Sequence, residues 1–228
     1  MIKPYRLRLL FLVLWAATLT SSNCVEPSPQ TPTENNAAGP TINLEMPAAG
    51  IWQGDIGEGF RSTVQTVSVE AGVALGMATF GSRQAHDMAL MSLSYGHMVG
   101  PVIGEGHWFR GNPELRAEVF GGGQFSPESQ WLLGLTPHLR YNFATGTRWI
   151  PFLDGGAGVS ATGIGHPDIG GTFEFNLQAC GGVHWFLRHD LALTGEVKYM
   201  HLSNAGIHHP NLGVNDIVGL IGVTWFFK

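Results

Sequence analysis

Charged residues are scarce in this sequence, and those present do not cluster. Lys, Arg, Asp and Glu make up 13% of the 228 residues, about half the fraction usual in soluble globular domains. The formal net charge is -5, and no run of Lys or Arg follows the first ten residues. The chain therefore lacks the basic patch on which nucleic-acid binding depends. With 44% hydrophobic residues, it has enough apolar side chains for one domain with a large buried or lipid-covered surface.

Cysteine is nearly absent as well. Cys24 and Cys180 are the only two, and a disulfide between them is not favoured. Cys180 lies within an apolar strand pattern, where a packed thiol is the ordinary explanation. Cys24 follows a leader-like segment and could be a lipidated N-terminus, but Asn23 before it fits poorly the small residue that such sites prefer.

Long apolar runs are also missing, apart from residues 9–19. Lys3, Arg6 and Arg8 precede that run and small polar residues follow it, which is the layout of a cleaved secretory signal peptide over residues 1–24. A membrane-spanning helix needs about 20 apolar residues, so this run is too short to be one. Any insertion into a membrane must therefore use strands.

Residues 25–60 differ in amino-acid composition from the rest of the chain. Up to about residue 50 they contain five prolines among Ser, Thr, Asn and Gln, with few residues able to pack. This composition predicts a disordered tether or plug over residues 25–60. Residues 61–228 then form the folded domain.

Alternating polar and apolar residues run through this domain in eight segments, separated by Gly, Pro, Asn or Ser clusters. In the first segment Val67, Val69 and Val73 share one face, and Ser68 and Glu70 share the other. This period of two predicts β-strands. The eight segments are residues 63–77, 87–99, 114–124, 131–143, 149–161, 172–186, 191–203 and 214–227.

The alternation alone does not separate a soluble β-domain from a barrel in lipid. Three features favour lipid: the apolar face is unbroken, the other face holds both acids and bases, and many segments exceed ten residues. Aromatic residues also lie near segment ends, where membrane interfaces place them; they are Tyr95, Tyr141, Trp149, Tyr199 and Trp225. The chain ends in aromatics, as many outer-membrane barrels do, although Lys228 is the final residue. We predict an all-β, eight-stranded antiparallel transmembrane up-and-down β-barrel.

A candidate site lies at the end of the seventh segment. His201 and Ser203 are two residues apart and share a face with Val197 and Tyr199, whereas Lys198 has the opposite parity. The pair is therefore expected to point toward lipid. Because both ends of such a barrel are periplasmic, the hairpin between the last two strands opens outside the cell, next to the outer leaflet.

Two neighbours of this pair extend the site. Asn215 on the eighth segment has outward parity, whereas Asp216 should face the lumen. An incidental His and Ser near the membrane interface would also explain the pattern. His208 and His209 suggest a metal site, but no carboxylate or Cys completes the ligand set, and we predict no metal.

The motif His-x-Ser-Asn-Ala-Gly over residues 201–206, followed by Pro-Asn-x-Gly over residues 210–213, resembles the signature of the lipid A 3-O-deacylase family. The similarity also covers residues 151–160, 173–175 and 188–191. It implies an eight-stranded barrel in the Gram-negative outer membrane. Such a barrel hydrolyses the acyl ester at position 3 of lipid A in lipopolysaccharide, without a cofactor.

The resemblance also assigns roles to residues. Ser203 is then the nucleophile and His201 its general base. The oxyanion donors come from Asn204, Ala205 and Gly206. Asn215 stands where the family's deacylases can have a glutamate. An asparagine can orient the imidazole but does not neutralise the imidazolium, so we expect a lower rate.

A rival function remains open from the sequence: a non-catalytic outer-membrane barrel that anchors, adheres or stabilises the envelope. This barrel would leave the mass of lipid A unchanged. The expected partners of the enzyme are lipid A and the surrounding outer-membrane lipid. The sequence leaves open whether it acts as a monomer or as a homodimer.

Overall fold

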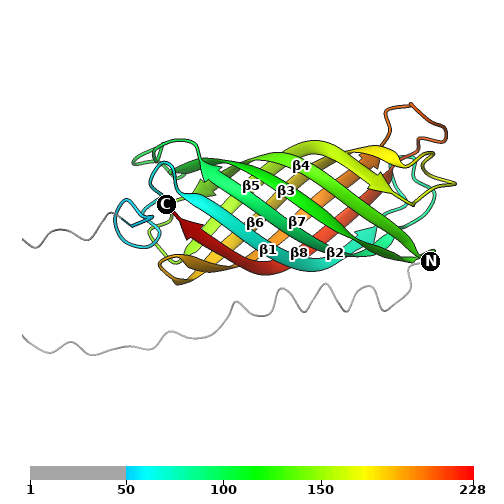
Figure 1. Ribbon diagram of the computed structural model, residues 1–228. Coiled ribbons are helices and arrows are strands. Elements are labelled where there is room, and N and C mark those ends of the chain that lie inside the picture. Colours follow the sequence, from blue (N-terminus) through cyan, green and yellow to red (C-terminus); the bar gives the residue numbers. More distant parts are fainter. Residues whose placement is uncertain (1–49) are drawn as a thin grey trace, which may run out of the picture. The chain divides into compact units, whose positions relative to one another are not determined.

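The computed structural model describes residues 50–228, which form a closed antiparallel barrel of eight strands (Figure 1). Each strand pairs with the next, and β1 closes the barrel against β8. The predicted signal peptide, Cys24 and the tether up to residue 49 lie outside the described residues. The strands are β1 (Gln65–Gly76), β2 (Asp87–Met98), β3 (Gly111–Ser126), β4 (Gln130–Phe143), β5 (Trp149–Thr162), β6 (Phe173–Arg188), β7 (Leu191–Ser203) and β8 (Val214–Phe227).

The strands follow the sequence prediction closely. The bounds of β7 and β8 are as predicted, and β3 differs most, since it begins three residues earlier and ends two later. Pro113 lies inside this extension and pairs with Tyr141 of β4. Its neighbour on the other side is residue 99, just beyond the end of β2, whose N–H donates to the Pro113 carbonyl at 3.1 Å. A proline is tolerated there because nothing beyond the end of β2 requires its missing N–H.

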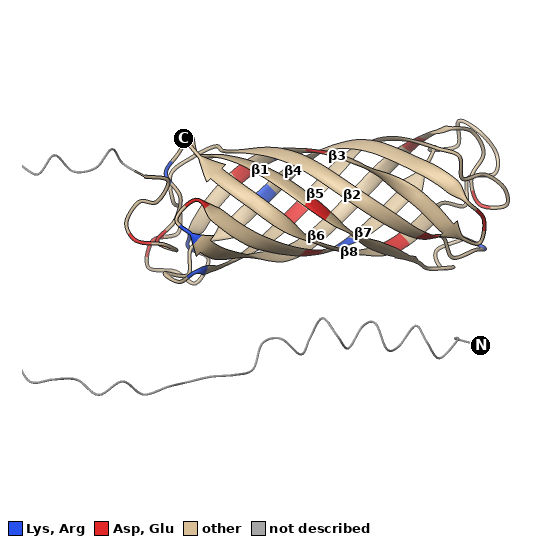
Figure 2. Ribbon diagram, turned by 60° about the horizontal axis from the view of Figure 1, so that its bottom comes forward, with Lys and Arg blue, Asp and Glu red and all other residues tan. Residues whose placement is uncertain are grey.

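The barrel wall is polar inside and apolar outside. Glu70, Arg116 and Glu118 are buried in the lumen, whereas Val69 and Leu115 on the same strands are exposed. Figure 2 shows a few acidic and basic positions in the middle of the strands and others near the barrel ends. A soluble β-sandwich would have the reverse arrangement, so the alternation is that of a transmembrane barrel.

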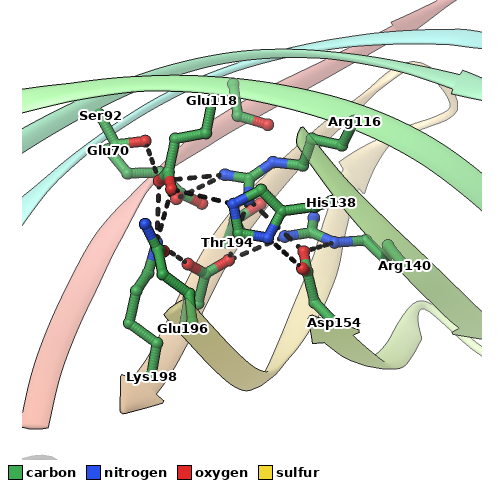
Figure 3. Close-up of polar contacts among 12 residues, drawn as sticks. Glu70, Ser92, Arg116, Glu118, His138, Arg140, Asp154, Thr194, Glu196 and Lys198 are labelled. Atoms are coloured by element: carbon green, nitrogen blue, oxygen red, sulfur yellow. Dashed lines mark hydrogen bonds and ion pairs between the residues drawn. The ribbon is translucent and has the colours of Figure 1, made fainter. Parts of the chain in front are cut away.

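A network of ion pairs fills the middle of the lumen (Figure 3). Lys198 Nζ lies 2.8 Å from both Glu118 Oε1 and Glu196 Oε1. Arg140 donates to Glu196 Oε2 and to Asp154 Oδ2, also at 2.8 Å each. Because buried charges need such partners, the lumen can hold charged side chains that neither lipid nor an apolar core could hold.

The barrel end at which β1 begins and β8 ends is packed with aromatic rings. Trp52 and Phe60 stack with centroids 4.6 Å apart, and Phe186 and Phe226 pack against them. The Trp52 indole N–H also donates to the His189 carbonyl at 2.9 Å. Ile51, Trp52 and Phe60 thus belong to the apolar cluster at this end of the barrel, and Ile56 packs against it.

Three connections at the opposite end meet at one residue, Asp168. We call them the outer loops: residues 77–86 between β1 and β2, 163–172 between β5 and β6, and 204–213 between β7 and β8. Asp168 accepts from the Arg83 and Gln84 amides at 2.6 and 3.0 Å and lies 3.0 Å from His86 Nε2. Its own carbonyl accepts from the Leu212 amide at 2.7 Å. Asp168 thus connects its own loop to the 77–86 loop through its side chain and to the 204–213 loop through its backbone carbonyl.

Within residues 50–228, no helix is long and apolar enough to cross a membrane.

Candidate active site

His201 and Asn215 face each other across β7 and β8, next to the outer loops. They are paired in register, and both have the outward parity that the sequence predicted. Met200 and Leu202, on either side of His201, are fully buried in the lumen. These two apolar anchors fix the strand so that the imidazole lies on the outer face of the barrel.

The Asn215 amide is oriented by groups at both of its ends. Its Nδ2 donates to the carbonyl oxygen of Thr79 at 3.0 Å. A carbonyl oxygen can only accept a hydrogen bond. Asn215 Oδ1 therefore faces His201 Nδ1, at 2.8 Å. Since Oδ1 is an acceptor, His201 Nδ1 carries the proton, and in the neutral ring Nε2 keeps its lone pair. This is the tautomer that a general base requires.

Tyr199 is a further contact of Asn215 that the sequence did not reveal. Its hydroxyl donates to Asn215 Oδ1 at 2.5 Å. Sequence reasoning placed Tyr199 only among the interfacial aromatics. Its parity, equal to that of His201, was the one signal that could have placed it in the site.

Gly213 explains one part of the Pro-Asn-x-Gly motif. Its backbone has φ +82°, and a Cβ there would lie 2.6 Å from His201 Cε1. A side chain would therefore strain the backbone and press on the imidazole. The glycine lets the β7–β8 loop pass close to the ring.

Ser203 ends β7 on the same face as His201, and it is half-buried. Phe175 of β6 pairs with it, and Leu177 pairs with His201. Among residues 50–228, no hydrogen bond joins Ser203 to His201. Phe175 and Leu177 are exposed, so an apolar surface borders the pair on the β6 side.

The segment 204–206 forms a tight turn beyond Ser203. Asn204 is fully buried, and its Nδ2 donates to the Gly170 carbonyl at 2.8 Å. Its Oδ1 accepts from the Gly206 amide at 3.0 Å. Of the three predicted oxyanion groups, Asn204 Nδ2 and the Gly206 N–H are thus engaged inside the loops. The Ala205 amide has no acceptor within the described part of the chain, and Ala205 has φ +54°.

Other candidate groups lie apart from this arrangement. Asp216 faces the lumen, as predicted, and is fully buried. His208 and His209 are exposed on the β7–β8 loop. In the described part of the chain, three side chains with suitable atoms within 4.8 Å of one another could hold a metal: His138, Asp154 and Cys180. They belong to the lumen network, where the guanidinium of Arg140 already binds the Asp154 carboxylate, so the surroundings disfavour a cation.

Comparisons with known proteins show a family and a fold for the chain. The family model described as lipid A 3-O-deacylase (PagL) matches residues 91–224, over half of the chain, including β7 and β8 up to residue 224. No curated protein matches the chain.

Among solved structures, the barrel is similar to the crystal structure of the outer membrane enzyme PagL. The two chains are 17% identical with a TM-score of 0.50, over 69% of this chain and 97% of that one. It is also similar to Neisserial surface protein A, with 15% identity and a TM-score of 0.55 over 71% and 96% of the two chains. At these identities the likeness is one of fold.

Proposed function

Because the chain belongs to the lipid A 3-O-deacylase (PagL) family, we propose that it is an outer-membrane esterase that removes the acyl chain at position 3 of lipid A. The observation that carries this proposal is the hydrogen bond from His201 Nδ1 to Asn215 Oδ1. It leaves the Nε2 lone pair as a base on the face that also presents Ser203. Ionisable groups facing lipid are costly, and they usually have a function there.

In the proposed reaction, Ser203 Oγ attacks the ester carbonyl as its proton passes to His201 Nε2. The tetrahedral intermediate collapses, the C–O bond to the sugar breaks, and the imidazolium gives the proton to the leaving sugar oxygen, which becomes a hydroxyl. Water, deprotonated by the same Nε2, then attacks the acyl-serine and releases the fatty acid. Substrate binding has to bring Ser203 within reach of His201, as often happens in hydrolases that lack a contact in the unliganded state.

The developing oxyanion needs a donor near Ser203. We assign direct donation to the Ala205 N–H, because Asn204 and Gly206 use their groups to hold the turn. Asn204 and Gly206 then contribute by aiming that amide. One oxyanion donor is worth about 3 kcal/mol of transition-state stabilisation.

The position of the pair also suits a lipid substrate. The exposed side chains of Phe173, Phe175 and Leu177 run along β6 beside Ser203 and His201. An acyl chain in the outer leaflet can lie along this surface without leaving the membrane. The predicted signal peptide over residues 1–24 would direct export to that membrane.

Mass spectrometry of lipid A tests the proposal. Expression of the full chain in a Gram-negative host should remove one acyl chain from position 3, and Ser203→Ala should abolish this loss. Ser126→Ala is the matched control, because Ser126 ends β3 at the same barrel end and is also half-buried. Unchanged lipid A with the folded wild type would favour the rival, a non-catalytic structural or adhesion barrel.

A further inference from the structure

The third position of the site, Asn215, is enclosed by groups that distinguish an amide from an acid. Oδ1 accepts from Tyr199 and His201, and Nδ2 donates to the Thr79 carbonyl. Asn215 is 1% exposed, so water does not reach these contacts. The amide oxygen thus has hydrogen-bond donors as partners, and the amide nitrogen has an acceptor.

We propose that Tyr199 and the Thr79 carbonyl are positioning groups of the site, and that they make an amide, not a carboxylate, the functional side chain at position 215. The inference rests on the proposed function for its catalytic meaning. It reverses the expectation that an acid at this position would serve His201 better.

The Thr79 carbonyl is the group that decides between amide and acid. It is held by a turn in which the Ser82 amide donates to it at 3.1 Å. A carboxylate at position 215 would place an oxygen against this carbonyl oxygen. Neither atom carries a proton and no solvent screens them, so the two would repel and the 77–86 loop would move.

The same carbonyl selects the tautomer of His201. A flipped Asn215 amide would turn Oδ1 toward Thr79 and present Nδ2 to the imidazole. His201 Nδ1 would then have to accept, and the ring proton would move to Nε2, which removes the base. The outer loop 77–86 thereby determines which ring nitrogen of His201 is protonated, although the loop does not contact the ring.

Tyr199 acts on the other end of the amide. An amide oxygen has two lone pairs, and the phenol and the imidazole take one each. The phenol therefore fixes the direction of Oδ1 and the plane in which the imidazole must lie. Loss of the hydroxyl would leave the imidazole bonded to a less restrained amide.

Kinetics of Tyr199→Phe test the first part. We expect kcat for lipid A deacylation to fall about fivefold, as for the loss of one hydrogen bond of about 1 kcal/mol, with KM little changed. In an Asn215→Ala background the same change should have no further effect, because Tyr199 acts through the amide. Tyr95→Phe is the control, since Tyr95 donates to Gln65 at the other barrel end. Equal effects of Tyr199→Phe with and without Asn215 would overturn the positioning role.

Asn215→Asp tests the second part, together with the nitrogen shifts of selectively labelled histidine in the full, folded chain. We expect kcat to fall at least about tenfold and the wild-type His201 to show protonated Nδ1 and unprotonated Nε2. Activity of Asn215→Asp equal to or above that of the wild type, or a wild-type Nε2–H ring, would overturn the inference. If the wild type left lipid A intact but showed the Nδ1–H ring, the proposed function would fail and the positioning arrangement would stand.

Discussion

His138 and His201 lie on opposite faces of the same barrel wall and differ in what their ring nitrogens contact. His138 faces the lumen, with Nδ1 2.6 Å from Asp154 and Nε2 3.2 Å from Glu118. His201 faces outward and contacts a neutral amide through Nδ1. Two carboxylates suit a charged imidazolium that serves as a structural cation, whereas one amide suits a neutral ring with a basic nitrogen. The partners, not the residue type, set the role.

Exchange of each histidine for alanine should separate the two roles most strongly. His201→Ala should lower lipid A deacylation by about a thousandfold or more, and the folded barrel should persist because the side chain supports no core. His138→Ala should leave deacylation nearly unchanged but lower the free energy of unfolding, since Asp154 and Glu118 lose a partner. Lipid A mass spectra and heat-modifiable gel mobility report the two effects. An inactive, fully stable His138→Ala would contradict the division.

Removal of a lumen charge tests the structural side alone. Lys198→Met leaves Glu118 and Glu196 without the ammonium that lies 2.8 Å from each, so we expect about 3–5 kcal/mol of destabilisation. Arg188→Met is the control, because its ion pair with Asp190 is exposed and worth about 0–1 kcal/mol. Unfolding by urea in lipid vesicles measures both. Similar losses in the two variants would show that the lumen network is not what stabilises the barrel.

Asn215→Ala should have an intermediate effect on the catalytic side. It removes the acceptor of His201 Nδ1, and the loss of such a bond costs about 1–3 kcal/mol, which is about fivefold to 160-fold in kcat. The imidazole itself remains, so the loss should be smaller than for His201→Ala. Single-turnover deacylation of lipid A in mixed micelles measures it. A loss as large as that of His201→Ala would make Asn215 a full catalytic member.

Gly213→Ala should have the smallest effect, about tenfold or less on kcat, because one methyl group displaces the imidazole and strains a left-handed backbone. Gly219→Ala on β8 is the matched control, since a Cβ there meets nothing within 4 Å. Steady-state rates of the two variants should differ, with both variants still folded as barrels. Equal rates would mean that the ring tolerates the displacement.

The sequence predicted the strands and their faces because a period of two is a local property. The parity of Glu196, Lys198, His201 and Asn215 followed from it. The contact between Asn215 on β8 and Thr79 in the 77–86 loop joins residues 136 positions apart, and no pattern in the sequence predicts it. The same holds for the internal bonds of Asn204, which the motif alone suggested as an oxyanion donor. Periodicity thus predicts the strands and which side chains face outward. The loop contacts that complete the site become apparent only in the closed barrel.

Because His201 and Ser203 point outward into the membrane, the substrate of the proposed reaction diffuses in two dimensions, within the plane of the membrane. A substrate in the outer leaflet reaches these side chains by sliding along the membrane plane, without passing over the outer loops or through the filled lumen. The relevant concentration is then the number of lipid A molecules per unit area, not per unit volume. Dilution with inert lipid should therefore slow the enzyme, whereas dilution with buffer should not.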